Sequence, residues 1–146
     1  MRRLVLPSLL MAVLAGCGAP TPTPTPTPMT TARMFWAADT GTSIRLFAED
    51  VQIAKTAAPG ITALRYLVSH RPVDPDYTSL WPPTTRIKGV TVSGSDATVD
   101  IAPVNLNVGS EAEGIAVQQL LWTLTSAQPE IHSMRITVDE IGRAHV

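Results

Sequence analysis

Proline occupies every second position from Pro20 to Pro28, alternating with threonine. Proline lacks the backbone N–H that helices and strand ladders need, so this stretch forms neither element. It favours polyproline II, which would extend it over roughly 28 Å. We expect the folded domain to follow this stretch, at residues 31–139. Residues 17–30 are then a spacer, either a spacer through the cell-wall matrix or a passive tether with no length requirement.

The segment before the spacer has the pattern of a lipoprotein signal peptide. Arg2 and Arg3 precede the apolar run Leu4–Leu14, and Ala15-Gly16 stand directly before Cys17. The run is shorter than the ~20 residues that span a bilayer, which argues against a membrane helix. We predict a leader at residues 1–16, cleavage between Gly16 and Cys17, and acyl chains, palmitate among them, on Cys17. Two or more such chains hold a protein on a membrane stably.

The composition argues against disulfide bonds and against a nucleic-acid partner. Cys17 is the single cysteine, so acylation leaves no thiol for a disulfide. Removal of Arg2 and Arg3 with the leader leaves nine basic and 12 acidic side chains, a formal net charge of −3. No basic patch stands out, which argues against a nucleic-acid partner.

Alternating hydrophobicity around short turn sequences predicts two strand pairs. The first pair surrounds Asp39–Thr42, and the second surrounds Gly94-Ser95, where a leading glycine suits a two-residue turn. A last alternating stretch predicts one more strand near the C-terminus. The predicted strands are Ala32–Ala38, Ser43–Ala48 with an extension or return to the sheet at Val51–Ile53, Arg86–Ser93, Ala97–Ala102 and Met134–Val138.

Two helices are predicted by apolar residues at helical spacing. Pro59 suits the first turn of one helix, which ends before Pro72. The other begins with Ser110 and Glu113, which fit a capping box, and stops before Pro129. The buried faces are predicted to comprise Ile61, Leu64, Leu67 and Val68 in the first helix and Val117, Leu120, Leu121 and Leu124 in the second.

The resulting order is β-β-α-β-β-α-β. This order predicts the α/β (α+β) class, as a single domain in which two helices cover one mixed β-sheet.

Four motifs occur in this order: Leu80–Ile87 leading into Val90-Thr91-Val92, then Ala97–Ile101, Gln118–Leu124 and Ile136–Asp139. Together they are similar to those of the GerMN domain of sporulation and spore germination proteins, over about Arg33–Asp139. The resemblance implies a non-catalytic domain found in sporulation proteins and in lipoproteins of high-GC Gram-positive bacteria. It also implies a role, in some members, in building envelope assemblies, and it supplies no catalytic residues.

A search for catalytic and metal-binding patterns finds no site of either kind in the sequence. There is no G-x-S-x-G elbow and no glycine-rich phosphate loop. Ser69 and His70 are neighbours, an arrangement that rarely makes a nucleophile–base pair. His70 and His132 share no ligand spacing, and Asp74-Pro75-Asp76 reads as a solvated turn rather than a cation site. We therefore expect no enzyme activity, no metal and no cofactor.

Aromatic residues are the candidates for a partner surface. Tyr77 and Trp81 lie in a proline-rich loop, where they either bind a partner or cap the edge of the core. Trp122 lies off the apolar stripe of its helix. It either packs under a loop or contacts another protein. Asp100, at the end of a predicted strand, is expected to accept hydrogen bonds from the following loop.

These observations predict a lipoprotein on the extracytoplasmic face of the cell membrane that binds an envelope protein. A binding protein for cell-wall glycan or a small ligand is the alternative, with Tyr77–Trp81 lining its groove. A hydrolase with a dispersed site is the least favoured interpretation.

The last seven residues, 140–146, are expected to be a sequencing artefact. Ile-Gly-Arg-Ala-His-Val can be encoded by ATC GGA AGA GCA CAC GTC, which matches common adapter DNA when it follows the AG of a glutamate codon. The resemblance also predicts glycine after Asp139, where Glu140 stands. We therefore expect the natural protein to continue past Asp139, with an immunoglobulin-like domain as one candidate.

Overall fold

The computed structural model describes residues 22–106 and 108–138. The predicted lipidation site at Gly16-Cys17 and the predicted artefact at residues 140–146 lie outside the described residues. The element order β-β-α-β-β-α-β and the α+β class are confirmed. The elements are β1 (Met29–Asp39), β2 (Ile44–Ala54), α1 (Pro59–Ser69), β3 (Ile87–Ser93), β4 (Asp96–Ile101), α2 (Ser110–Ala127) and β5 (Ser133–Val138).

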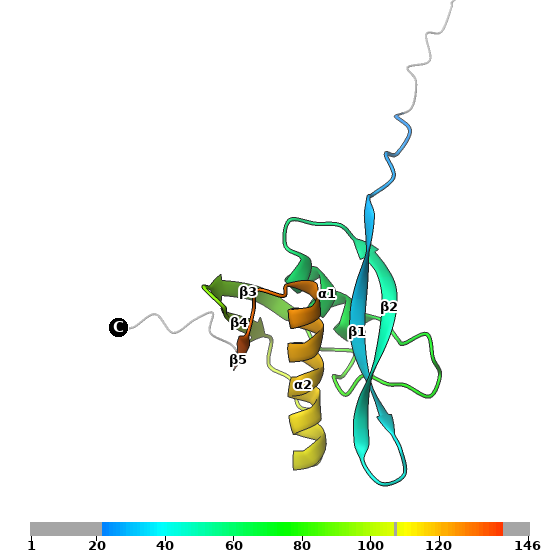
Figure 1. The fold of residues 1–146 in the computed structure, drawn as a ribbon, viewed down its shortest axis with the longest axis vertical. Coiled ribbons are helices and arrows are strands. Elements are labelled where there is room, and N and C mark those ends of the chain that lie inside the picture. The colour runs from blue at the N-terminus through cyan, green and yellow to red at the C-terminus, as the bar shows by residue number, and fades with distance from the viewer. Residues whose placement is uncertain (1–21, 107, 139–146) are drawn as a thin grey trace, which may run out of the picture.

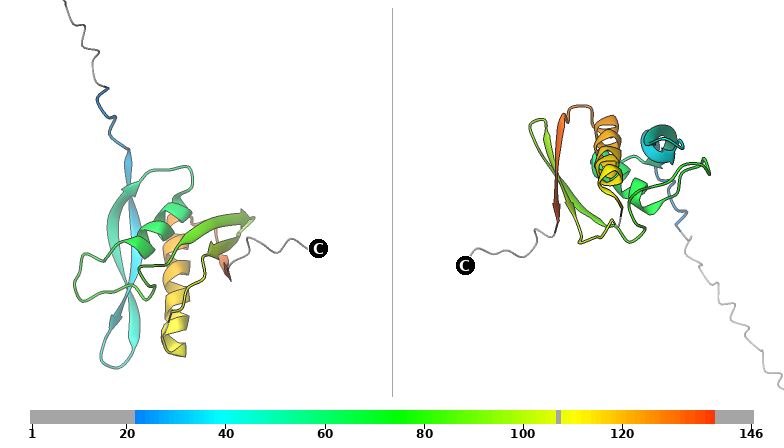
Figure 2. Two further views of the ribbon diagram at one scale, coloured as in Figure 1. Left: turned by 180° about the vertical axis from the view of Figure 1, so that it is seen from behind. Right: turned by 90° about the horizontal axis from the view of Figure 1, so that it is seen from below.

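The strands form two sheets, whereas a single mixed sheet was predicted. β1 and β2 pair only with each other, and the second sheet has the order β3-β4-β5. This second sheet is mixed, because β4 pairs antiparallel with β3 and parallel with β5. The two helices lie between the sheets, as Figures 1 and 2 show. The domain is therefore a three-layer β-α-β arrangement with the helices in the middle.

The first hairpin is a long ribbon whose inner face packs on α2. Met34 and Trp36, two positions apart on β1, are fully buried. Their period of two matches the side-chain alternation of a strand. β2 runs without a break to Ala54, so the predicted Val51–Ile53 segment extends the same strand. Residues 22–28 before the ribbon adopt neither helix nor strand, as predicted from their prolines.

The second hairpin turns at Gly94-Ser95, as predicted. Gly94 has φ of +62°, a conformation that suits glycine at the start of such a turn. Beyond it, Ala97, Val99 and Ile101 alternate along β4 and are buried against the helices. β4 is the central strand of its sheet, while β5 forms one edge.

The second helix differs from its prediction in two ways. Gly109, not Ser110, is the N-cap residue, and as a glycine it makes no side-chain cap hydrogen bond, so the predicted capping box of Ser110 with Glu113 is wrong. The buried face is also rotated: Leu120 and Leu124 are buried as predicted, but Val117 is exposed and Leu121 only half-buried. The buried residues of α2 are Ala116, Gln119, Leu120, Thr123 and Leu124.

Gly60 of α1 packs tightly against the C-terminal end of α2. A Cβ added there would lie 2.2 Å from Gln128 Oε1 and 2.7 Å from Leu124 Cδ1. The Gly60 N–H also donates to Gln128 Oε1 at 3.2 Å. Only the absence of a side chain lets α1 pack this tightly on α2.

Gly60→Ala is therefore expected to lower the free energy of unfolding by about 1–3 kcal/mol, the usual range for overpacking. Gly114→Ala is the matched control, since a Cβ there meets nothing within 4 Å. In a helix that change should stabilise by about 0.5–1 kcal/mol. Urea unfolding of both variants measures the contrast, and equal effects would contradict the close helix contact.

Among the described residues, no helix combines the length and hydropathy needed to cross a bilayer.

Candidate functional site

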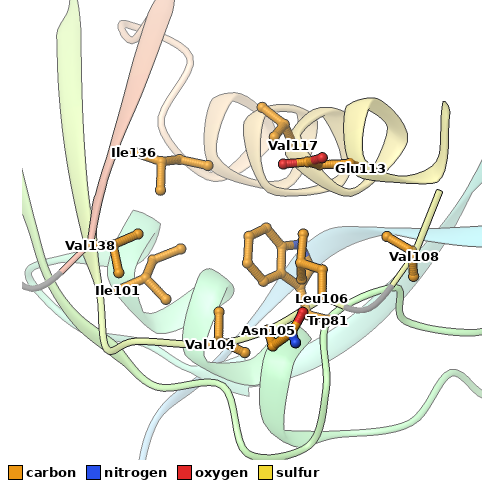
Figure 3. A pocket seen from close by; sticks show the side chains of 10 residues that line it. All are labelled: Trp81, Ile101, Val104, Asn105, Leu106, Val108, Glu113, Val117, Ile136 and Val138. Carbon is orange, nitrogen blue, oxygen red and sulfur yellow. The ribbon is translucent and has the colours of Figure 1, made fainter. Parts of the chain in front are cut away.

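A groove whose lining side chains are mostly apolar opens where β4 and β5 end and α2 begins. It encloses about 770 Å³. Figure 3 shows its lining side chains converging from α2, β5 and the segment before α2. They are Trp81, Ile101, Val104, Asn105, Leu106, Val108, Glu113, Val117, Ile136 and Val138.

Trp81 forms the floor of this groove and is only 5% exposed. Its indole Nε1–H donates to the Ala116 carbonyl oxygen of α2 at 2.9 Å. The neighbouring Leu80 N–H donates to Gln119 Oε1 on the same helix at 3.2 Å. These bonds fix the proline-rich segment on α2. Trp81 is therefore buried at the edge of the core, which is one of the two roles that the sequence left open for it.

The groove can bind apolar groups because its walls are aliphatic. Val108, Val117 and Val138 remain 37%, 38% and 56% exposed along it. Among the described residues that line it, Glu113 in the first turn of α2 is the single charged one. The site therefore offers hydrophobic contact beside one negative charge. Sequence reasoning missed most of this lining, although the alternation of Val104, Leu106 and Val108 in a loop was an available signal.

A second hollow, of about 670 Å³, lies between the end of α1 and residues 70–83. Tyr77 and Trp81 both line it, so the structure brings the two predicted residues together here. Tyr77 is half-buried and stacks on Phe47 of β2, with ring centroids 5.3 Å apart. Glu49 accepts hydrogen bonds from the N–H groups of Val73 and Asp74 at 3.0 and 2.7 Å. These contacts hold the loop on the ribbon, which is a structural role.

Ser69 and His70 also line the second hollow, but their contact closes the helix end. Ser69 Oγ lies 2.8 Å from His70 Nδ1, yet it donates its proton to the Arg65 carbonyl at 2.6 Å. The imidazole stacks flat on Tyr66, with centroids 3.9 Å apart. A hydroxyl whose proton is held by a helix carbonyl is not activated by a base. This arrangement supports no nucleophilic catalysis.

The predicted acidic candidates have local structural partners. Asp74 Oδ1 accepts a hydrogen bond from the Asp76 N–H at 2.9 Å, which forms the expected turn. Asp100 Oδ2 lies 3.7 Å from Lys88 Nζ on the neighbouring strand, and its Oδ1 has no partner. The expected hydrogen bonds to Asp100 from the following loop are therefore not formed. Within residues 22–106 and 108–138, no three His, Cys, Asp or Glu side chains gather to hold a metal.

Trp122 lies on the other side of α2 from the groove-lining Val117. Its ring packs edge-on against Phe35 of β1, with centroids 5.4 Å apart, and stays 41% exposed. One part of the Trp122 ring is thus covered by the ribbon, and the rest is exposed.

On the ribbon, the ion pair between Arg33 and Asp50 shifts the pKa values of both groups. Arg33 Nε donates to Asp50 Oδ1 at 2.9 Å, which lowers the pKa of the Asp50 carboxyl and raises that of Arg33. Both groups are exposed, so solvent screening leaves little effect on stability. Neither residue lines the groove at Trp81.

Comparison with known proteins finds one matching family and several solved structures with a similar fold. Residues 33–141 match a family model described as sporulation and spore germination. The tandem GerMN domains of the sporulation protein GerM from Bacillus subtilis superpose with a TM-score of 0.64 at 12% identity, covering 84% of this chain and 43% of that one. The chain thus spans less than half the length of that tandem structure.

Two further structures share the fold. The first GerMN domain of Bacillus subtilis GerM gives a TM-score of 0.60 at 22% identity, over 76% of this chain and 84% of that one. A protein from Clostridium perfringens described as a lipoprotein gives 0.51 at 13% identity, over 81% of each chain. At these identities the likeness shows the fold alone. A search of curated proteins finds no significant match.

Proposed function

The chain belongs to the sporulation and spore germination family, and we propose that it acts as a non-catalytic interaction module of the cell envelope. In this proposal the lipid on Cys17 holds it on the extracytoplasmic face of the membrane. The Pro/Thr spacer then carries the domain away from the bilayer. A protein partner binds at the groove above Trp81.

The observation that carries this proposal is the exposed aliphatic wall of the groove. Val108, Val117 and Val138 lie partly open beside a hollow of about 770 Å³. Exposed apolar surface costs solvation free energy, and contiguous patches of it mark sites where a partner binds. The anchored Trp81 gives the groove a rigid floor, which lowers the conformational cost of binding. The family supports the proposal as well, because it is not known as catalytic.

The glycan alternative gains little support from the geometry. A sugar ring stacks on an exposed aromatic face, whereas Trp81 is 5% exposed and Tyr77 already stacks on Phe47.

Val117→Glu tests the proposal by placing a charge in the groove wall. We expect partner capture, measured by crosslinking in intact cells and purification, to fall more than tenfold, since an unpaired buried charge opposes binding. Val117 is 38% exposed in the free protein, so the fold should persist.

Gln118→Glu adds the same charge one residue along, at an exposed position outside the groove lining, and serves as the control. It should leave capture unchanged. Thermal unfolding of both variants separates lost binding from lost folding. Equal capture by Val117→Glu and the parent chain would overturn the groove as the partner site.

A further inference from the structure

The open edge of β5 lies directly beside the groove. β5 forms one edge of the order β3-β4-β5 and pairs with β4 alone. Within the part of the chain that the structure describes, no hydrogen bond reaches its other edge. Every second residue of such a strand directs its N–H and C=O away from the sheet, where another strand can bind them.

Other edge strands of the domain are partly covered from within the chain. On β1, Ala37 forms a two-bond bridge with Thr78 at 2.8 Å for each bond, and the Phe35 N–H donates to Thr123 Oγ1 at 3.2 Å. On β3, the Arg65 guanidinium donates to the carbonyl oxygens of Ile87 and Lys88, both at 3.3 Å. The outer edge of β2 is likewise unpaired among the described residues, so what distinguishes β5 is its place beside the groove, which Ile136 and Val138 line.

The inward side chains of β5 continue into the groove. Ile136 pairs in register with Val99 of β4, and Val138 pairs with Ile101. Val117 of α2 is exposed. Figure 3 shows that Val117 comes from α2 and that Ile136 and Val138 come from β5. A fourth strand beside β5 would place its own inward side chains between Ile136 and Val117. Main-chain pairing and side-chain burial would then act together, the combination used in strand addition.

We propose that the occupant of this site is an extended segment of a partner protein that pairs with the β5 edge as a fourth strand. Its alternate residues are apolar and fill the groove, and a Lys or Arg lies near Glu113. This inference rests on the proposed function, because it specifies what the groove binds.

Charge and length argue for this occupant. Glu113 is the single charged residue in the part of the groove lining that the structure describes, so a basic side chain in the partner complements it. β5 has six residues, a length of about 20 Å. An edge this short is small for a stable globular interface, which buries about 800 Å² on each partner, and it suits a short peptide segment. A second copy of the chain and a lipid acyl chain are the competing occupants.

The test uses the purified full-length chain and a library of octapeptides. Alternate positions carry Val, Ile, Leu or Phe, and the remaining positions carry Thr, Ser or Lys. A library of the same composition without alternation is the control. We expect selection to enrich alternating peptides that contain Lys.

Backbone N-methylation then tests the strand pairing. Each enriched peptide is made in two forms, methylated on the N–H groups of one strand edge or of the other. Only one edge faces β5, so one form should lose at least tenfold in affinity while the other binds as before. Glu113→Lys should weaken binding of the Lys peptides at least threefold, and Glu111→Lys, which changes net charge equally outside the lining, should not.

Three results would overturn the strand model: no enrichment of the alternating library, equal binding by both N-methylated forms, or dimerisation that Val117→Glu abolishes. Displacement of the peptides by a fatty acid, together with equal affinity of the two N-methylated forms, would instead assign the groove to an acyl chain. If N-methylation has no effect but Val117→Glu still loses the envelope partner, the strand model fails and the proposed function stands. If Val117→Glu keeps that partner, the proposed function fails too.

Discussion

Replacing Leu120 by alanine should lower the free energy of unfolding by about 2–5 kcal/mol. Leu120 is fully buried in the core cluster between the two sheets. Deleting its methyl groups leaves a cavity that the two layers cannot both close, since α2 packs on each of them. Urea or thermal unfolding measures the loss.

Leu121→Ala is the control for that experiment because it removes the same atoms one residue along the helix. Leu121 is half-buried and lies outside the core cluster. We expect a loss below about 1 kcal/mol there. Equal losses at the two positions, or the larger loss at Leu121, would contradict the orientation of α2.

The rotated face of α2 explains why the sequence pattern misplaced it. The apolar spacing predicts one buried stripe, but the helix is covered by two layers. Its buried positions include Gln119 and Thr123, whose polar atoms bond to backbone N–H groups of Leu80 and Phe35. Polar residues that satisfy another element's backbone cannot be recognised as core from hydrophobicity alone.

The hairpins were predictable because their signals are local. Gly94 supplies the positive φ that the two-residue turn needs, and alternation sets the flanking strands. The division into two sheets was not predictable, because it depends on which layer each hairpin packs against. The groove shares this limit: it joins residues from α2, β5 and the segment before α2, and only Trp81 among them stood out as a candidate.

Cys17→Ser should move the protein from the membrane to the soluble fraction, or leave the leader uncleaved. Serine lacks the thiol that accepts the first acyl chain, and the membrane affinity of those chains, about 0.8 kcal/mol per buried CH₂, is then lost. Cell fractionation with gel mobility measures both outcomes. Thr23→Ser, a conservative change within the spacer, should fractionate like the parent chain. Identical mobility and fractionation of Cys17→Ser and the parent would contradict the lipid anchor.

The central claim is that a protein partner contacts the β5 side of the domain while the protein is in the envelope. Photo-crosslinking in intact cells tests it most directly, with the crosslinking amino acid placed at Val138 or at Val92. Both valines are exposed, at 56% and 41%, on opposite edge strands of the same sheet. The account predicts an adduct with an envelope protein at Val138, lost in Val117→Glu, and none at Val92. No adduct at Val138, or equal adducts at the two positions, would contradict it.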